Sequence, residues 1–209
     1  VGELNRRSAE IAKDAAEEYT RKNPGKPRFV AGSIGPTKKT LSLGTDVEDP
    51  GRRSVTFDEM VENYEEQIAA LVDGGVDILL PETTFDTLVL KACLYAIQRF
   101  FDKGGKRVPV MVSGTIFDNG RTLSAQPVES FALSVEHFPA LSIGLNCAVG
   151  VEQMRPHLEK LAQWTHLPIS CYPNAGMPDG FGGFTGSIKQ TAEALGEFAS
   201  NGWLNFVGG

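Results

Sequence analysis

The amino-acid sequence predicts an α/β protein built as a (β/α)8 barrel, with about six of the eight strands present and the N-terminal two missing. Six short runs of aliphatic and β-branched residues recur along the 209 residues, and a helical pattern separates each run from the next. Apolar runs with so few interruptions are typical of strands that helices cover on both faces, as in parallel sheets. The alternation of strand and helix therefore predicts a parallel sheet that is either open or closed into a barrel.

The six predicted strands help to decide between these two architectures. They cover residues 28–32, 76–80, 108–112, 141–145, 167–171 and 203–207. The first leads into the sequence GSIGPT at 32–37, which lacks the G-x-G-x-x-G pattern of an open dinucleotide-binding sheet, so the barrel is favoured. A whole barrel needs eight strand–helix units and roughly 250 residues. Because the chain opens on a helical pattern, we expect the two missing strands on its N-terminal side.

The segments around the strands carry signals for the starts and ends of helices. Helices are expected over residues 4–22, 56–73, 86–103, 127 onward, 151–165 and 187–200. Thr56 and Glu59 form a capping-box pattern at the start of the second helix, which should end at the Gly-Gly pair at 74–75. Its apolar stripe consists of Met60, Tyr64, Ile68 and Val72. Asp86 can cap the third helix, and Pro127 suits the first turn of the fourth.

Composition and charge exclude several classes of partner. The chain holds 20 Lys and Arg against 26 Asp and Glu, and it has no clustered basic run that could follow a phosphate backbone. No apolar stretch approaches the roughly 20 residues that cross a bilayer, and the polar N-terminal pattern is unlike a secretory leader. We therefore expect one cytoplasmic domain over residues 1–209 that binds neither nucleic acid nor a membrane.

The three cysteines are expected to differ in their surroundings. Their odd number and the absence of a C-x-x-C pair argue against a disulfide framework. Cys93 falls in a predicted helix and Cys171 in a predicted strand, so both should be buried small hydrophobic residues. Cys147 directly follows a strand, which would place its sulfur at the mouth of the barrel rather than in the hydrophobic layers.

Polar residues gather where the predicted strands end, and barrel active sites lie at these carboxyl ends. The segments concerned are Gly35-Pro36-Thr37, Glu82-Thr83-Thr84, Ser113-Gly114-Thr115, Asn146-Cys147, Tyr172-Pro173-Asn174 and Gly208-Gly209. Glu82 has two interpretations from its position: a charge that favours the dipole of the following helix, or a ligand for the substrate. The histidines His137, His157 and His166 fall on or beside helices and are expected at the surface.

Seven short motifs follow one another along nearly the whole chain. They are VAGSIGPT at 30–37, LPETTFDT at 80–87, VSGTI at 112–116, GRTLS at 120–124, GLNCA at 144–148, YPNAG at 172–176 and NFVGG at 205–209. In these motifs the chain resembles the homocysteine-binding domain of cobalamin-dependent methionine synthase. The loop DVEDPGR at 46–52, with TFD at 56–58, is more similar to the cobalamin-dependent enzymes than to the shorter betaine- or S-methylmethionine-dependent relatives.

The resemblance implies a (β/α)8, or TIM, barrel that holds one zinc ion by three cysteine thiolates. Cys147 would be the first ligand, and two further cysteines are expected directly after Gly209. Zinc would activate the thiol of homocysteine for methylation. The methyl group would come from methylcobalamin carried by another domain, so the expected partners are homocysteine and the folate- and cobalamin-binding domains of the same polypeptide.

The resemblance also implies roles for four residues in substrate binding. Glu82 would bind the ammonium group of homocysteine, and Asn174 would lie close to the metal. Ser113 and Thr115 would complete the substrate site.

Two other interpretations stay open. The chain could belong to a homocysteine methyltransferase that uses betaine or S-methylmethionine, or it could be a catalytically inert fragment of the barrel. Because Cys147 is one of the three expected thiolates, these residues alone are expected to bind zinc weakly or not at all and to be inactive. The missing strands would also leave two unpaired sheet edges.

Overall fold

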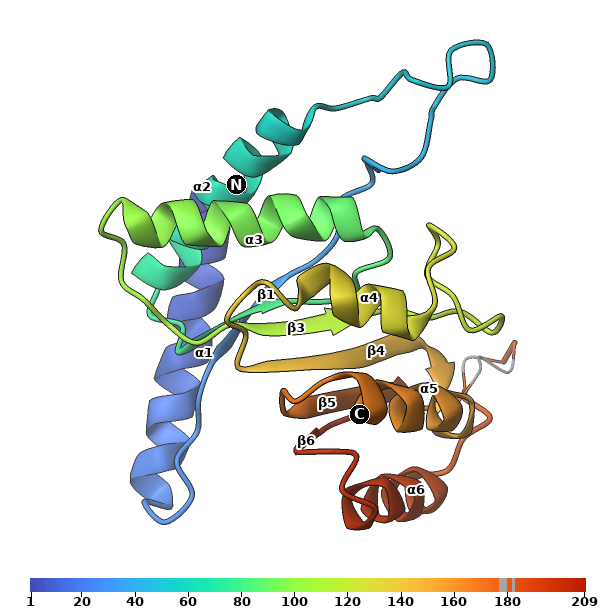
Figure 1. The fold of residues 1–209 in the computed structure, drawn as a ribbon. Helices are drawn as coiled ribbons and strands as arrows, with labels where there is room; N and C mark the ends of the chain where they lie inside the picture. The colour runs from blue at the N-terminus through green and yellow to red at the C-terminus, as the bar shows by residue number, and fades with distance from the viewer. Residues whose placement is uncertain (177–179, 182) are drawn as a thin grey trace. The chain divides into compact units, whose positions relative to one another are not determined.

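A computed structural model describes residues 1–176, 180–181 and 183–209 of the chain. The chain divides into two compact units, which are described separately. Unit 1 consists of Val1–Pro81 and Leu88–Met111, and unit 2 of Glu82–Thr87 and Val112–Gly209. Six helices and six strands alternate along the described residues (Figure 1), which confirms the predicted α/β class.

Unit 1 is built from helices around a short parallel strand pair. Its elements are α1 (Gly2–Lys22), β1 (Ala31–Ile34), α2 (Phe57–Asp73), β2 (Ile78–Pro81) and all but the first residue of α3 (Thr87–Asp102). Strands β1 and β2 pair in parallel, with Ala31 opposite Ile78. The predicted capping box is present, because the Thr56 side chain accepts from the Glu59 backbone N–H and the Glu59 carboxylate accepts from the Thr56 N–H. All four residues of the predicted stripe on α2 are buried.

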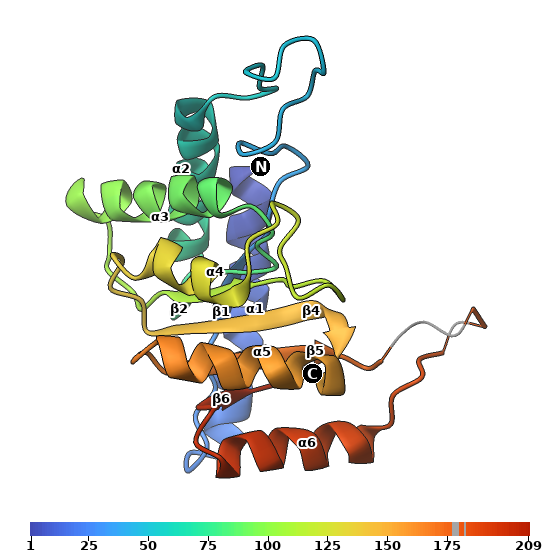
Figure 2. The ribbon, with the colours of Figure 1, turned by 45° about the vertical axis from the view of Figure 1, so that its right-hand side comes forward.

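Unit 2 contains a four-stranded sheet in the order β3-β4-β5-β6. Its elements are β3 (Met111–Gly114, whose first residue closes unit 1), α4 (Val128–Val135), β4 (Ser142–Gly150), α5 (Val151–Trp164), β5 (Ile169–Asn174), α6 (Ile188–Ser200) and β6 (Phe206–Val207). The β4–β5 and β5–β6 pairs are parallel. Figure 2 shows α5 and α6 packed next to each other beside these strands. The largest buried side chains here include Phe131, Ile143, Leu145, Met154 and Phe198.

The strands begin one to three residues later than the sequence predicts, and all but β6 also end later. Asn146, Cys147 and Asn174, predicted to follow their strands, therefore lie within β4 and β5. Val30 and Val76 illustrate the cause of the later starts, since both are buried apolar residues that precede the paired part of their strands. An apolar run marks burial, whereas a strand is defined by backbone pairing, so the run starts before the ladder does. None of the helices in the described part of the chain has an apolar stretch long enough to cross a membrane.

Glu65 on α2 forms an ion-pair cluster with Arg99 on α3 and with Lys103 just after that helix, and this cluster should make stability depend on pH. Its carboxylate accepts hydrogen bonds from the Arg99 guanidinium and from Lys103 Nζ, the latter at 2.7 Å. The Arg99 bonds, assisted by Lys103 and opposed by desolvation, lower the pKa of Glu65 from its ordinary value of 4.5 to about 2. A carboxyl with a lowered folded-state pKa stabilises the fold above its unfolded pKa and loses that contribution as pH falls.

We therefore expect the free energy of unfolding to fall between about pH 5 and pH 2, and the Glu65→Gln variant to show a shallower fall over this range. Urea unfolding at a series of pH values measures both curves. Asp58→Asn, which changes an exposed acidic residue on the same helix outside the cluster, is the matched control and should keep the wild-type slope. Equal slopes for wild type and Glu65→Gln would contradict the prediction.

Candidate functional site

Asn146, in the middle of β4, is the centre of a buried hydrogen-bond network in unit 2. Its Oδ1 accepts from Ser113 Oγ at 2.6 Å and from the Thr83 backbone N–H at 3.0 Å. Its Nδ2 donates to Thr83 Oγ1 at 2.8 Å, and its backbone carbonyl accepts from Thr115 Oγ1 at 2.9 Å. Ser113 and Thr115, both predicted substrate residues, are buried and donate their hydroxyl groups to Asn146.

The backbone around Asn146 adopts unusual conformations. The φ angles of Thr83, Cys147 and Ala148 are 56°, 62° and 62°. These values lie in the left-handed region, which residues other than glycine rarely adopt. The strand register also shifts here, because Asn146 lies opposite Tyr172 whereas Gly150 lies opposite Asn174. Such conformations cost about 1–3 kcal/mol each and persist where the surrounding structure enforces them, often at functional sites. The network therefore marks the strongest candidate site in unit 2.

Glu82 is placed at the edge of this network by the residues that follow it. The Thr84 backbone N–H donates to the Ser113 carbonyl at 3.2 Å, and the Thr115 N–H donates to the Thr84 carbonyl at 2.8 Å. Glu82 is half-buried and lies close enough to Tyr172 that burial and the Glu82 carboxylate together raise the pKa of the tyrosine. Glu82 precedes α3 by five residues, and the effect of the helix dipole falls off within one turn, so the structure does not support the interpretation of Glu82 as a helix-end charge.

The three cysteines differ as the sequence predicts. Cys93 on α3 and Cys171 on β5 are buried. Desolvation raises the pKa of Cys171 to about 12 and also raises that of Cys93, so both thiols stay protonated at neutral pH. Cys147 is partly exposed at the register shift. It is therefore the cysteine whose sulfur a metal or a substrate can reach.

Cys147 can contribute one ligand to a metal, but the described residues do not complete a site around it. No group of three His, Cys, Asp or Glu side chains that could hold an ion occurs in residues 1–176, 180–181 and 183–209. A catalytic zinc site needs three protein ligands and one open position. The partly exposed thiol of Cys147 could therefore be one of the three protein ligands of such a site.

Asn174 faces a different feature, which we call the α6 groove. This cavity of about 560 Å³ is lined by the end of β5, one face of α6 and the residues after β6. Its lining includes Asn174, Ile188, Leu195, Gly208 and Gly209. Asn174 and Gly209 thus line the same groove, and Asn174 ends the strand that carries Tyr172.

Gly208 lies against the ring of Tyr172, and this close approach should make it sensitive to substitution. Its backbone N–H donates to the Cys171 carbonyl at 3.1 Å, and a Cβ at this position would lie 2.4 Å from Tyr172 Cδ1. We expect Gly208→Ala to destabilise the protein by about 1–3 kcal/mol, because the ring or the terminal segment must shift. Thermal unfolding monitored by circular dichroism measures the change.

Gly196→Ala is the matched control. Gly196 lies on α6, where an added Cβ would meet nothing within 4 Å. Alanine is favoured over glycine in a helix by up to about 1 kcal/mol, so this variant should be as stable as the wild type or more stable. An unchanged melting temperature for Gly208→Ala would show that the Tyr172 ring accommodates the methyl group freely.

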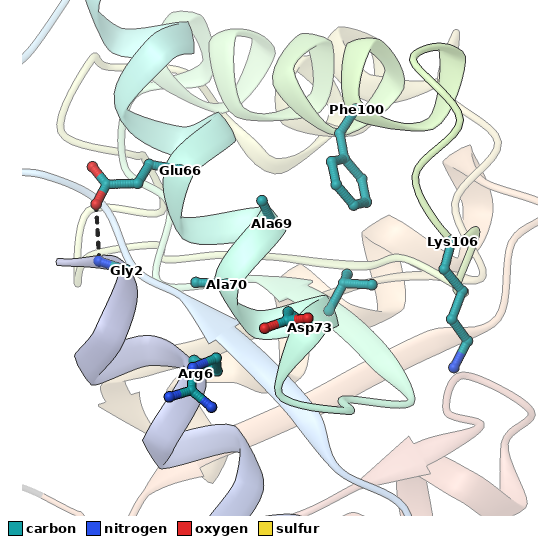
Figure 3. A pocket seen from close by; sticks show the side chains of 9 residues that line it. Gly2, Arg6, Glu66, Ala69, Ala70, Asp73, Phe100 and Lys106 are labelled. Atoms are coloured by element: carbon teal, nitrogen blue, oxygen red, sulfur yellow. Dashed lines mark hydrogen bonds between the residues drawn. The ribbon is translucent and has the colours of Figure 1, made fainter.

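A second groove, in unit 1, contains none of the predicted site residues. It has a volume of about 710 Å³ and is lined by α1, α2, the end of α3 and Lys106. Figure 3 shows the Phe100 ring above Asp73, with Glu66 bonded to the backbone N–H of Gly2. The charge of Arg6 in this groove is already paired with Glu3 and Glu10.

The sequence does not predict the network around Asn146. The sequence predicts Asn146 and Cys147 just beyond a strand, whereas the structure places both within β4, and its hydrogen bonds show that the Asn146 amide reaches Thr83. An asparagine that directly precedes a strand-end cysteine is the signal that could have drawn attention to it.

Comparison with known proteins identifies what the whole chain is similar to. The family described as homocysteine S-methyltransferase matches residues 1–209. The homocysteine methyltransferase MmuM from Escherichia coli, in its metallated form, is 25% identical with a TM-score of 0.78, and the match covers 100% of this chain and 65% of that one. Its apo form is 23% identical with a TM-score of 0.77, and the match covers 100% of this chain and 67% of that one.

These likenesses confirm the predicted barrel fold. The MmuM structures are TIM barrels, and the described residues of this chain form six strands of such a barrel in alternation with helices. This chain spans about two thirds of the length of the chains that it matches. A more distant likeness, to the amine oxidase HisD from Pseudomonas geniculata at 12% identity and a TM-score of 0.52, covers 79% of this chain and 28% of that one and concerns the fold alone.

Proposed function

Because this chain belongs to the homocysteine S-methyltransferase family, we propose that residues 1–209 bind homocysteine and present its thiol for methylation. The observation that carries this proposal is the pair of hydrogen bonds by which Asn146 joins the segment bearing Glu82 to the segment bearing Cys147. A carboxylate and an accessible thiol are thereby held on neighbouring segments. The carboxylate matches the ammonium group of homocysteine, and the thiol can help to hold a metal ion that would bind its sulfur atom.

The proposed roles follow from the chemistry of the side chains. Glu82 binds the substrate ammonium through a charge-assisted hydrogen bond, which fixes the orientation of the amino acid. Asn174 offers an amide beside the metal position. Ser113 and Thr115 act through Asn146, because their hydroxyl groups donate to it.

Cys147 would supply one thiolate to a zinc ion, together with two cysteines expected directly after Gly209. In support of this, Gly209 and Asn174 line the same groove, so residues that follow Gly209 would start beside Asn174. Zinc, when bound, supplies a positive charge that keeps a coordinated thiol deprotonated at neutral pH.

The reaction transfers a methyl group to sulfur. The homocysteine sulfur forms a new bond to the methyl carbon, the bond from that carbon to its donor breaks, and the donor keeps the electron pair. The thiol proton leaves to solvent. We propose methylcobalamin, held by another domain of a cobalamin-dependent methionine synthase that also binds folate, as the donor.

The choice of donor rests on the loop of residues 46–52. The structure holds it in place through an ion pair between Arg52 and Asp46 at 3.2 Å and a backbone bond from Thr45 to Arg52 at 3.3 Å. In sequence, this loop together with residues 56–58 resembles the cobalamin-dependent enzymes more than the shorter betaine- or S-methylmethionine-dependent relatives.

Methyl transfer assays with the protein encoded by the whole gene test the proposal. Homocysteine is offered with methylcobalamin, betaine or S-methylmethionine in separate reactions, and methionine is measured. Turnover with methylcobalamin supports the proposed donor. Turnover with betaine or S-methylmethionine alone would replace that donor and keep homocysteine, whereas no methionine from any donor would favour an inert barrel.

A further inference from the structure

We propose that Asn146 is a positioning residue that sets the placement of Glu82 and Cys147 together, so that binding at the two is coupled. This inference rests on the proposed function, because it assigns Glu82 and Cys147 to the two ends of one substrate site. It goes beyond that function by naming a residue that need touch neither the substrate nor the metal. Its observations are the three hydrogen bonds of the Asn146 side chain and the left-handed residues on both sides of the network.

The orientation of the Asn146 amide is dictated by Thr83. A backbone N–H can only donate, so the amide atom that faces the Thr83 nitrogen at 3.0 Å must be Oδ1. Nδ2 then faces Thr83 Oγ1 at 2.8 Å and donates to it. One buried side chain therefore holds both the backbone and the side chain of Thr83.

The two hydrogen bonds from Asn146 hold Thr83 in a backbone conformation that threonine rarely adopts. Thr83 has a φ of 56°, and a β-branched residue in the left-handed region is a genuine outlier. The two bonds from Asn146 compensate for that conformation and so determine the direction in which the chain leaves Glu82. Removing them should let Thr83 return to a negative φ and turn Glu82 away from its present direction.

The same residue also fixes the start of the Cys147 segment. The Asn146 carbonyl accepts from the buried Thr115 hydroxyl at 2.9 Å, and Cys147 and Ala148 follow with φ angles of 62° each. Because the side chain and the main chain of Asn146 are both held, the Cα–Cβ direction of Cys147 is set relative to Thr83. A change at Asn146 should thus affect both ends of the proposed substrate site.

The variant Asn146→Leu tests this, since leucine has a similar size and makes none of the three hydrogen bonds. In the protein encoded by the whole gene, we expect zinc affinity and homocysteine affinity each to fall by about tenfold or more, the range seen when supporting residues around metal ligands are changed. Zinc affinity is measured by competition with a chelator, and homocysteine affinity by calorimetry. In the metal-free protein, hydrogen exchange at the Thr83 amide should accelerate.

A second substitution separates positioning from a loss of stability. In the double variant Asn146→Leu/Thr83→Gly, glycine adopts a positive φ without strain, so homocysteine affinity should recover in part. Thr122→Val is the matched control, because Thr122 is a buried threonine of unit 2 whose hydroxyl bonds to Ser124 and to the Gln126 backbone. This control should keep both affinities.

The outcomes decide the inference separately from the proposed function. If Asn146→Leu keeps both affinities within twofold, or if Thr83→Gly restores nothing, Asn146 is not a positioning residue, although a zinc-binding site that needs Cys147 would still stand. If zinc binding does not depend on Cys147, the proposed function fails. If hydrogen exchange at the Thr83 amide is also the same in Asn146→Leu as in the wild type, the inference about Asn146 fails as well. Should Asn146→Leu not fold, Thr83→Val removes the partner of Nδ2 alone and should lower both affinities in the same direction.

Discussion

Replacing Cys147 with serine is expected to remove zinc from the protein encoded by the whole gene. The wild-type protein should hold about one zinc per chain, and the Cys147→Ser variant less than about a tenth of that after dialysis, because a serine hydroxyl stays protonated at neutral pH and is a far weaker ligand than a thiolate. Metal analysis by plasma emission spectroscopy measures both values. Activity with homocysteine should fall to background in the same preparation.

Cys93→Ala provides the matched control for this prediction. Cys93 is buried in α3, and desolvation raises its pKa so far that it stays protonated, so its removal should leave the zinc content unchanged. Residues 1–209 alone supply one accessible thiol, and we expect them to hold zinc weakly or not at all. A Cys147→Ser protein with full zinc occupancy would overturn the assignment of the metal ligand and leave the fold untouched.

The order of helices and strands could be predicted because both depend on local sequence patterns. The stripe of α2 repeats at the helical period, and Thr56 with Glu59 caps that helix through bonds three residues apart. Strand bounds were less accurate, because Val30 and Val76 are buried without belonging to the paired segments. The hydrophobic periodicity of the sequence indicates which side chains are buried, but it does not indicate which backbone groups pair.

The candidate site could be predicted in part. Strand-end position and the resemblance together singled out Glu82 and Cys147, and the structure links the segments on which they lie. The role of Asn146 could not be predicted, because it depends on the hydrogen bonds to Thr83 and on the left-handed conformation of that residue. Both arise from long-range packing, since Thr83 and Asn146 are 63 residues apart in the sequence.

Replacing Glu82 with glutamine is expected to raise the KM for homocysteine by about a hundredfold. The variant keeps the size of the side chain and removes its charge, which an ammonium group needs as a partner, and the loss corresponds to about 2.7 kcal/mol at 1.36 kcal/mol per tenfold change. Steady-state kinetics with varied homocysteine measures the KM. Glu159→Gln, which neutralises an exposed glutamate on α5, is the control and should leave the KM unchanged.

A substrate analogue isolates the contact that this prediction assigns to Glu82. 4-Mercaptobutanoate carries the thiol and the carboxylate of homocysteine but lacks the ammonium group, so Glu82 has nothing to bind in it. The wild-type protein should prefer homocysteine by about a hundredfold, and Glu82→Gln should lose most of that preference, because the interaction energy belongs to the pair and is absent when either partner is removed. If Glu82→Gln weakened the binding of homocysteine and of 4-mercaptobutanoate equally, Glu82 would act on the shape of the site, and another residue would bind the ammonium group.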